Sequence, residues 1–238
     1  MAMSRRQLSV EGVDVVVDGA WTVRELFLGI DEGQALALLG GPAAGKSTLL
    51  EAIAGRRAPS RGDIRLDGRS LAGRGPAALL ELGIAHAGQR PALFPGLDIG
   101  QHLRLGHLTS RSQARAAQAR VLRLIPELAG RLGQKVEELD RGRARLVDVG
   151  RALMSAPWLL LLDEPSLDLD GERLERLARA LAEEGIAVLL AERYPYPALR
   201  LAERACLMVS GRIVAEGSAA EVAGDSRLVP ACTGELSL

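Results

Sequence analysis

The chain carries no excess charge of either sign, because 30 lysines and arginines balance 30 aspartates and glutamates. Such a protein has no global field that would draw it to nucleic acid or to an anionic membrane surface. It also lacks any apolar run of the about 20 residues that a membrane-spanning helix needs. No apolar segment of the secretory type follows residues 1–6, so we expect no secretory signal. We therefore expect no nucleic-acid partner, and we expect any membrane contact to depend on another subunit.

Cysteine and histidine are scarce, with two and three residues respectively. Cys206 and Cys232 form no C-x-x-C pair, and Cys206 lies in an apolar run, which favours a small buried side chain and a reducing, cytoplasmic compartment. The histidines lack the spacing and the paired cysteines of a zinc site, so we interpret them as solvated or packed. They are His86, His102 and His107.

With 238 residues and 47% hydrophobic content, the chain is large enough for one large domain, or for one domain with a small inserted lobe. Its apolar periodicity alternates between strand and helix, which predicts an α/β fold with a mostly parallel sheet covered by helices. A turn is expected at 31–33, and loops are expected at 55–62 and 73–76. The predicted strands are 8–17, 35–39, 83–87, 158–162 and 186–191, and the predicted helices are 46–54, 114–125, 144–154 and 172–183.

A glycine-rich segment between strand 35–39 and helix 46–54 fits the phosphate-binding pattern G-x-x-x-x-G-K-[ST]. Its glycines allow backbone N–H groups to surround phosphate oxygens, and the following helix adds a favourable dipole. Lys46 is expected to reach the β- and γ-phosphates of ATP, and Ser47 to bind Mg²⁺. The alternative is a glycine-rich turn with a chance lysine. The segment reads Gly40, Gly41, Pro42, Ala43, Ala44, Gly45, Lys46, Ser47 and Thr48.

Two carboxylates end the apolar strand 158–162, at the edge where open α/β sheets bind ligands. Asp163 is expected to hold Mg²⁺ through water, and Glu164 to act as general base on the attacking water. A solvated strand end is the alternative reading of this pair. The phosphate loop upstream favours the catalytic one.

Three further features follow in order around these motifs: Gln89 between them, the arginine-containing segment 150–154 before the acidic strand, and Asp170 after it. This arrangement resembles the ATP-binding subunits of ABC transporters across nearly the whole chain. The local sequence is most similar to the branched-chain (hydrophobic) amino-acid importer subfamily in four segments, 82–86, 93–95, 150–154 and 161–167.

The resemblance implies a single ABC ATP-binding domain over 1–238. Its P-loop NTPase core would comprise 1–88 and 157–238, with an N-terminal antiparallel β portion, and the inserted helical lobe would comprise 89–156. It also implies that Gln89 senses the metal and the γ-phosphate and joins core to lobe, and that Asp170 communicates across a dimer. Together these implications make Glu164, Gln89 and Arg193 catalytic and Ser47, Gln89 and Asp163 the Mg²⁺ ligands.

The implied partners are a second ATP-binding subunit, membrane permease subunits and, indirectly, a substrate-binding protein. The implied location is the cytoplasmic face of the cell membrane. The permease would dock near Phe94, Pro95 and Ile99, although ordinary core packing is the alternative for these apolar side chains. Residues from Gly224 onward show no recognisable chemistry.

The family's Leu-Ser-Gly-Gly-Gln signature corresponds here to Leu139, Asp140, Arg141, Gly142 and Arg143. In that family the serine and the glycine N–H groups hold the γ-phosphate of ATP bound to the opposite subunit. Asp140 instead places an anion near a phosphate, which is unfavourable unless Arg141 or Arg143 compensates. We expect this half-site to be weak or inactive.

Three other positions depart from the family. Arg193 replaces the switch histidine, and although it can contact a γ-phosphate it cannot titrate as histidine does. Val17 or Asp18 replaces the aromatic residue that stacks on adenine; Trp21 is a possible substitute, but we interpret it as a core residue. Pro42 and Ala43 replace asparagine and glycine, and proline removes a donor from the phosphate nest.

The hypothesis that fits these departures is an asymmetric heterodimer, in which this chain binds Mg-ATP and a partner donates an intact signature. One alternative is a pseudo-ATPase that completes such a complex without chemistry. Another is a soluble ABC-type protein that acts on DNA or ribosomes, which the neutral charge and the lack of a second cassette oppose.

Overall fold

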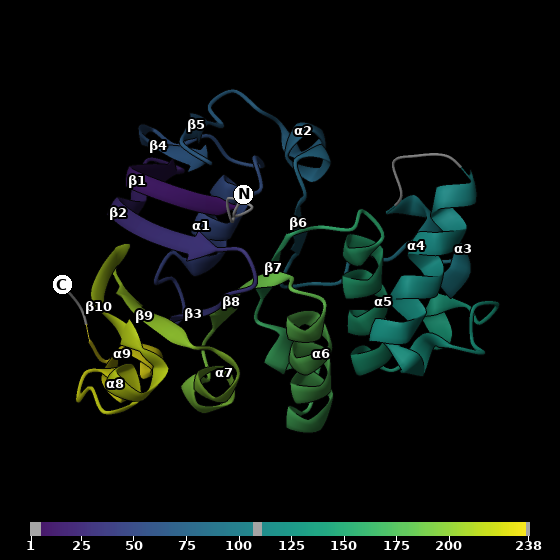
Figure 1. Cartoon of the computed structure of the whole chain (residues 1–238). Coiled ribbons are helices and arrows are strands. Elements are labelled where there is room, and N and C mark those ends of the chain that lie inside the picture. The colour runs from purple at the N-terminus through teal and green to yellow at the C-terminus, as the bar shows by residue number, and fades with distance from the viewer. Residues whose placement is uncertain (1–5, 107–110, 237–238) are drawn as a thin grey trace, which may run out of the picture.

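The larger of two sheets carries the phosphate loop and the acidic strand in the computed structural model, which describes residues 6–106 and 111–236 (Figure 1). Its strand order is β10-β9-β3-β8-β7-β6, and the strands from β9 to β6 run parallel. This confirms the expected mostly parallel sheet. The strands are β3 (Ala35–Leu39), β6 (Ile84–Ala87), β7 (Leu159–Asp163), β8 (Ala187–Glu192), β9 (Arg204–Val209) and β10 (Arg212–Ser218).

The smaller sheet is antiparallel, with the order β2-β1-β4-β5. A two-residue turn at Asp18 and Gly19, both with positive φ, joins its first two strands, as is common in tight hairpins. Sequence analysis missed β2, because a bulge near Glu25, which also has positive φ, interrupts its alternation. The strands are β1 (Gln7–Val17), β2 (Ala20–Asp31), β4 (Arg61–Leu66) and β5 (Arg69–Ser70).

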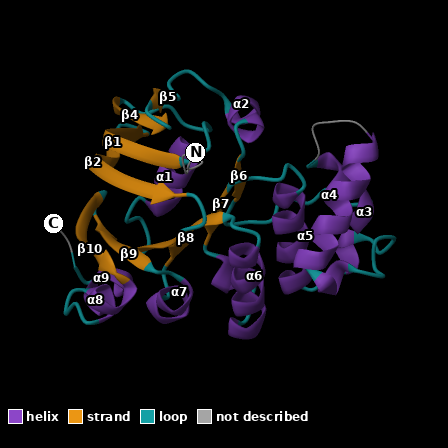
Figure 2. Ribbon diagram, in the orientation of Figure 1, coloured by secondary structure: helices purple, strands orange, loops and turns teal. Residues whose placement is uncertain are grey.

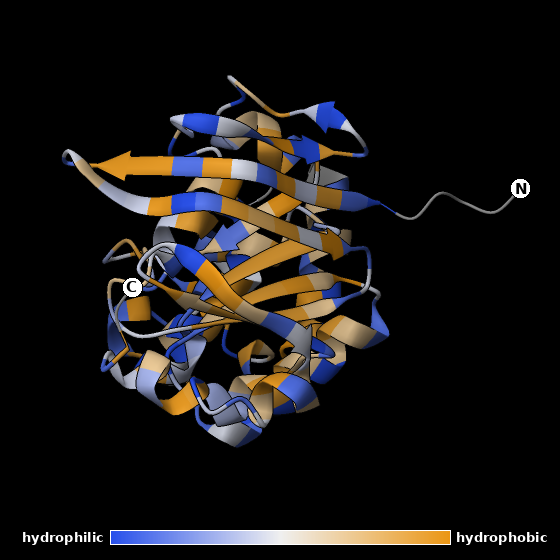
Figure 3. Cartoon of the chain, turned by 90° about the vertical axis from the view of Figure 1, so that its left-hand side faces the viewer, coloured by the Kyte–Doolittle hydropathy of each residue, from blue (hydrophilic) through white to orange (hydrophobic). Residues whose placement is uncertain are grey.

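Helix α1 (Lys46–Ile53) lies between the two sheets, and its buried face shares one apolar cluster with both of them. The opposite face of the large sheet is covered by α6, α7, α8 and α9, which form a second apolar cluster with it (Figure 1). Figure 3 shows the apolar strands in the interior and hydrophilic residues towards the outside. These helices are α6 (Gly171–Glu183), α7 (Pro195–Leu201), α8 (Ala219–Ala223) and α9 (Leu228–Thr233).

Helices α3, α4 and α5 form a group to one side of the sheets that contains no strand (Figure 2). Their apolar residues continue the cluster on the α6 face, so the group is joined to the sheet by packed side chains. The remaining helix, α2 (Pro76–Glu81), precedes β6. The group comprises α3 (Ile99–Leu105), α4 (Arg111–Leu124) and α5 (Arg141–Leu153), and the 3-10 turns are η1 (Pro126–Leu128), η2 (Val136–Glu138) and η3 (Pro165–Leu167).

Several predicted boundaries were wrong. Strand β4 begins inside the expected loop 55–62, and α2 begins at the last residue of the expected loop 73–76, because proline suits the first turn of a helix. Helix α5 begins at Arg141 rather than at 144, since Asp140 caps it. Within 6–106 and 111–236, no helix is both long and apolar enough to cross a membrane.

Candidate functional site: a phosphate loop with two carboxylates

The segment between β3 and α1 closes tightly enough to require glycine. Gly45 has φ 102°, and a Cβ there would lie 2.3 Å from the carbonyl oxygen of Thr22. A Cβ at Gly41 would lie 2.8 Å from the carbonyl oxygen of Ala231. Ala43 also has positive φ, 59°, a conformation that costs alanine more than glycine. The loop is thus held in one shape by backbone contacts from β2 and from α9.

Lys46 is the buried cation at the centre of this loop, with an exposed fraction of 4%. Its Nζ donates to the carbonyl oxygens of Gly40 at 2.8 Å and Gly41 at 3.0 Å. It also lies 3.4 Å from Oε1 of Glu164. The ammonium group can exchange these oxygen partners for phosphate oxygens with little movement of its side chain. Its positive charge is balanced by oxygen atoms both before and after the exchange.

Glu164 links the phosphate loop to Gln89. Its backbone is left-handed, with φ 45° and ψ 51°, and its N–H donates to the carbonyl of Ala191 at 2.8 Å. The side chain of Gln89 donates from Nε2 to Oε2 of Glu164 at 2.8 Å, opposite the contact with Lys46. A strained backbone held in place by its surroundings is typical of functional sites. The structure therefore brings two predicted site residues, Lys46 and Gln89, to the carboxylate of a third, Glu164.

Asp163 and Ser47 form the adjoining part of the site. Asp163 is almost fully buried, and burial raises its carboxyl pKa, while a hydrogen bond from the Ser47 hydroxyl opposes that rise. Its Oδ1 has no hydrogen-bond partner among the described residues. A buried carboxylate oxygen without a partner, next to a serine hydroxyl, offers the hard oxygen ligands that Mg²⁺ prefers. These residues therefore fit the metal that the sequence predicts.

A cavity of about 290 Å³ opens over the phosphate loop. Arg193, which follows β8, lines it with its exposed side chain. This residue is far from the loop in the sequence but lies beside it in the structure. Thr22 on β2 lines it as well. The remaining lining residues are Pro42, Ala43, Ala44, Gly45, Lys46, Ser47, Thr48, Gln89 and Glu164.

Comparison with known proteins agrees with this geometry. The family model described as "ABC transporter" matches residues 23–167. The high-affinity branched-chain amino acid transport ATP-binding protein BraG of Pseudomonas aeruginosa is 31% identical over 231 residues, which cover 95% of this chain and 99% of BraG.

The chain belongs to the ABC transporter family. It is an ATPase of this family, with ATP and Mg²⁺ as its cofactors. The Fe(3+) ions import ATP-binding protein FbpC of Streptomyces coelicolor is 36% identical over 222 residues, which cover 90% of this chain but only 63% of that protein. A solved ATP-binding cassette of an ABC transporter in its ADP conformation superposes with a TM-score of 0.86 at 21% identity, over 96% of this chain and 99% of that one.

In this ABC ATPase the segment 139–143 lies outside the cavity of its own chain. Asp140 caps α5 by accepting from the N–H of Arg143 at 2.9 Å, and it also pairs with the Arg143 guanidinium at 2.5 Å. That backbone hydrogen bond, together with the nearby arginines, lowers the pKa of Asp140. The carboxylate is therefore charged and directed at its own helix terminus.

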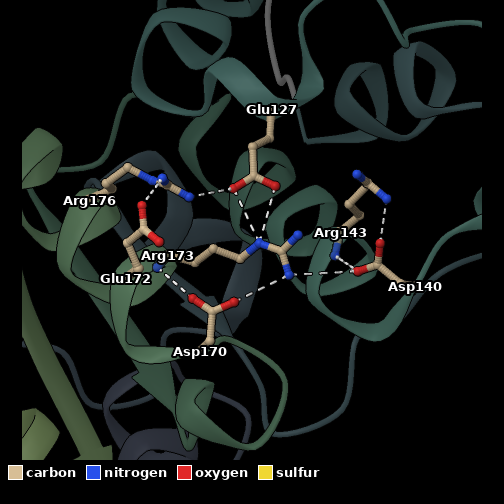
Figure 4. A network of polar contacts seen from close by, with 7 residues as sticks. All are labelled: Glu127, Asp140, Arg143, Asp170, Glu172, Arg173 and Arg176. Carbon is tan, nitrogen blue, oxygen red and sulfur yellow. Dashed lines mark hydrogen bonds and ion pairs between the residues drawn. The ribbon is translucent and has the colours of Figure 1, made fainter.

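Figure 4 shows that the same carboxylate belongs to a wider network. Arg173 on α6 lies 4.0 Å from Asp140 and 3.6 Å from Asp170, and its Nε contacts Glu127 of η1 at 3.2 Å. Asp170 in turn caps α6. One guanidinium thus joins the caps of two helices, and the predicted dimer-contact residue Asp170 lies within this network.

The interpretation of Trp21 as a core residue was wrong. Its side chain is 43% exposed, since it precedes Thr22 at the open end of β2, and the Arg61 guanidinium lies 5.9 Å from its ring centroid. Val17 and Asp18 end β1 and enter the hairpin turn. An exposed aromatic side chain therefore stands next to a residue that lines the cavity.

Sequence analysis missed Glu192, a fully buried carboxylate at the end of β8. Ser166 donates to it from its N–H at 2.9 Å and from its hydroxyl at 2.6 Å. Burial raises the pKa of Glu192, and these hydrogen bonds oppose the rise. An acidic residue at the carboxyl end of an apolar strand was the available signal. The carboxylate anchors the turn that directly follows Glu164.

The C-terminal helix was missed as well, and its sequence gave no sign of a contact with the site. The N–H of Gly41 donates to the carbonyl of Ala231 at 2.8 Å. Burial raises the pKa of the Cys232 thiol. Helix α9 therefore contacts the phosphate loop through the carbonyl of Ala231.

The two described histidines, His86 and His102, do not line the cavity over the phosphate loop. His102 is buried, with Nε2 3.2 Å from the backbone N of Phe94. Burial and, to a smaller extent, Arg56 lower the pKa of His86 to about 4. His107 lies outside the described residues. In the described part of the chain, no group of three or more histidine, cysteine, aspartate and glutamate side chains could hold a metal.

Proposed function

We propose that this chain couples binding and hydrolysis of Mg-ATP to the transport of branched-chain or other hydrophobic amino acids by an ABC importer. The observation that carries the proposal is the cluster of Lys46, Glu164 and Gln89 on a phosphate loop that lines a cavity. The cargo class is supported by BraG, whose length the chain spans almost completely, whereas it spans only part of the iron-import relative.

The residues around the cavity divide the chemistry between them. Lys46 would exchange its two carbonyl contacts for β- and γ-phosphate oxygens, and backbone N–H groups of the loop would bind the same oxygens. Glu164 would then lose its contact with Lys46 and accept a proton from the attacking water, while Gln89 fixes its orientation. Arg193 would stabilise charge on the γ-phosphate.

Ser47, Asp163 and Gln89 are the proposed holders of Mg²⁺, with Asp163 acting through water. When bound, the ion supplies positive charge that neutralises phosphate oxygens. The unpartnered Oδ1 of Asp163 supports this assignment. Trp21 is the proposed platform for the adenine ring, because it is exposed and adjoins Thr22 at the cavity.

A second ATP-binding subunit with an intact signature is the proposed partner, because that signature would complete the nucleotide site of this chain, whereas a homodimer would place Asp140 in both sites. Residues 89–156 are the proposed helical lobe that contacts permease subunits at the cytoplasmic face of the membrane. Phe94 is 55% exposed and suits such a contact. Ile99 does not, because it is fully buried in the apolar core, so the core alternative holds for that residue.

A pseudo-ATPase is the second candidate, and the position of Asp140 favours it. If the site binds nucleotide without hydrolysis, titration calorimetry will detect Mg-ATP binding that Lys46→Met abolishes, yet no complex that contains the chain will show hydrolysis dependent on its site.

Transport is tested with the complex that co-purifies with the chain, reconstituted in vesicles with its substrate-binding protein. ATP-dependent uptake of leucine or valine, with no uptake of ferric ion, ribose or sulfate, is the expected result. Uptake of one of the other cargoes would overturn the proposed cargo class and leave the energy-coupling proposal intact.

A further inference from the structure

Arg145 is a fully buried guanidinium outside the cavity, with an exposed fraction of 1%. It lies on α5, five residues after the helix cap Asp140. Burying a cation is costly unless it is paired and hydrogen-bonded, so its partners are informative.

Those partners come from two loops of the catalytic site. One terminal nitrogen of Arg145 donates to the carbonyl of Gly88 and the other donates to the carbonyl of Gln89. The second nitrogen also lies 3.2 Å from Oδ2 of Asp168, in the turn that follows Glu164. A single side chain therefore holds the backbone of Gln89 and the turn after the proposed base.

The segment 88–97 contains no helix or strand of its own, so its position depends on such contacts. Arg151, six residues further along α5, donates to the carbonyl of Ala92 at 2.6 Å and pairs with Asp148. Helix α5 thus fixes the segment at two points. Only the Arg145 point is adjacent to the Gln89 side chain, which donates to Glu164.

We propose that Arg145 is a positioning residue that ties α5 to Glu164 through Gln89. The inference rests on the proposed function, because it assigns Glu164 as the base. Since α5 begins in the segment proposed to meet the partner's nucleotide, a displacement of α5 moves the Gln89 backbone and changes the contact between Gln89 and Glu164. Binding of nucleotide at the partner's site would in this way change the position of the Glu164 carboxylate of this chain.

The closing experiment is a double-mutant cycle between Arg145→Met and Gln89→Ala in the hydrolysing complex. If Arg145 acts through Gln89, each single change lowers kcat by about tenfold with little change in KM for ATP, and the double variant falls no further. A fall of about a hundredfold in the double variant, which means that the two effects are independent, overturns the proposal.

Hydrogen exchange of the nucleotide-free chain gives a readout that does not depend on hydrolysis. Arg145→Met is expected to speed exchange in residues 88–97. Arg120→Met is the matched control, because Arg120 joins α4 to Glu184 at 2.7 Å and touches neither the segment nor the cavity. Unchanged exchange in Arg145→Met, or equal acceleration in both variants, overturns the proposal.

Asp168→Asn covers the case in which Arg145→Met does not fold. It removes the ion pair but leaves both carbonyl contacts, so a smaller loss of kcat is expected, again absent in the Gln89→Ala background. If the wild-type complex does not hydrolyse ATP, the proposed function fails, whereas exchange in residues 88–97 still decides whether Arg145 positions Gln89.

Discussion

Replacing Asp140 with serine should strengthen ATP-dependent association of this chain. In the heterodimer we propose, this carboxylate faces the γ-phosphate bound by the partner subunit. Asp140 is 44% exposed, so its repulsion is screened. Two unit charges about 4 Å apart in water interact by about 1 kcal/mol, so one to two phosphate charges give about 1–2 kcal/mol, a factor of about 5–30 in the dissociation constant.

The change should leave the fold intact. Serine and asparagine cap helices about as well as aspartate does, so α5 keeps its N-cap. The lost pair with Arg143 is exposed and contributes about 0.2–1 kcal/mol. Freed from Asp140, the Arg143 guanidinium becomes available to the phosphate.

The assay is Mg-ATP-dependent association with the co-purified partner ATP-binding subunit, followed by light scattering, with Glu164→Gln in this chain to suppress hydrolysis at its site. Asp140→Ser and Asp140→Asn are compared, because asparagine removes the charge without restoring the family's serine. Equal strengthening in both variants assigns the effect to charge. Unchanged association in both, with unchanged melting temperatures, would refute the reasoning.

Three further predictions concern single side chains. Trp21→Ala should raise KM for ATP up to about tenfold, the equivalent of a stacking contribution of about 0.5–1.5 kcal/mol, and ATP should quench the fluorescence of Trp21 but not that of buried Trp158; unchanged KM and fluorescence would exclude the platform. Glu192→Gln should raise the melting temperature at pH 7 by about 2–4 °C for each kcal/mol gained. Burial raises the pKa of Glu192, so its carboxyl group stays protonated to higher pH in the folded protein than in the unfolded chain. Wild type therefore loses stability as pH rises between the unfolded and the folded pKa of Glu192. The stability gained by Glu192→Gln should shrink near pH 4, and a lower melting temperature of the variant at pH 7 would contradict this. Both cysteines are buried, and burial raises the pKa of Cys206 to about 12, so a thiol reagent at pH 8 should modify neither until the chain unfolds; rapid reaction of Cys232 in the native protein would show that α9 opens.

The sequence predicted the parts of the site in which local pattern and chemistry coincide. The phosphate loop and the pair Asp163–Glu164 could be predicted because a glycine-rich turn and an acidic strand end each carry their own signal. Gln89 and Arg193 required the family resemblance, since each is a single polar residue after a predicted strand and neither forms a motif of its own.

The remaining parts depend on contacts between distant segments. Strand β2 was missed because a bulge at Glu25 breaks its period, and Trp21 was misplaced because its exposure follows from its position at the end of that strand. The support of Gly41 by Ala231 joins residues far apart in the chain. A periodicity argument considers one segment at a time, so it cannot predict such pairs.

The central claim is that the chain's own carboxylate drives hydrolysis. The most direct test is ATP hydrolysis by the complex that co-purifies with the chain, with wild type and Glu164→Gln in the same assembly. Glu175→Gln is the control, because Glu175 pairs with Arg200 and does not line the cavity over the phosphate loop. We predict a strong loss of hydrolysis for Glu164→Gln and wild-type hydrolysis for the control. An unchanged rate in an intact Glu164→Gln complex would contradict the account and leave the chemistry to the partner.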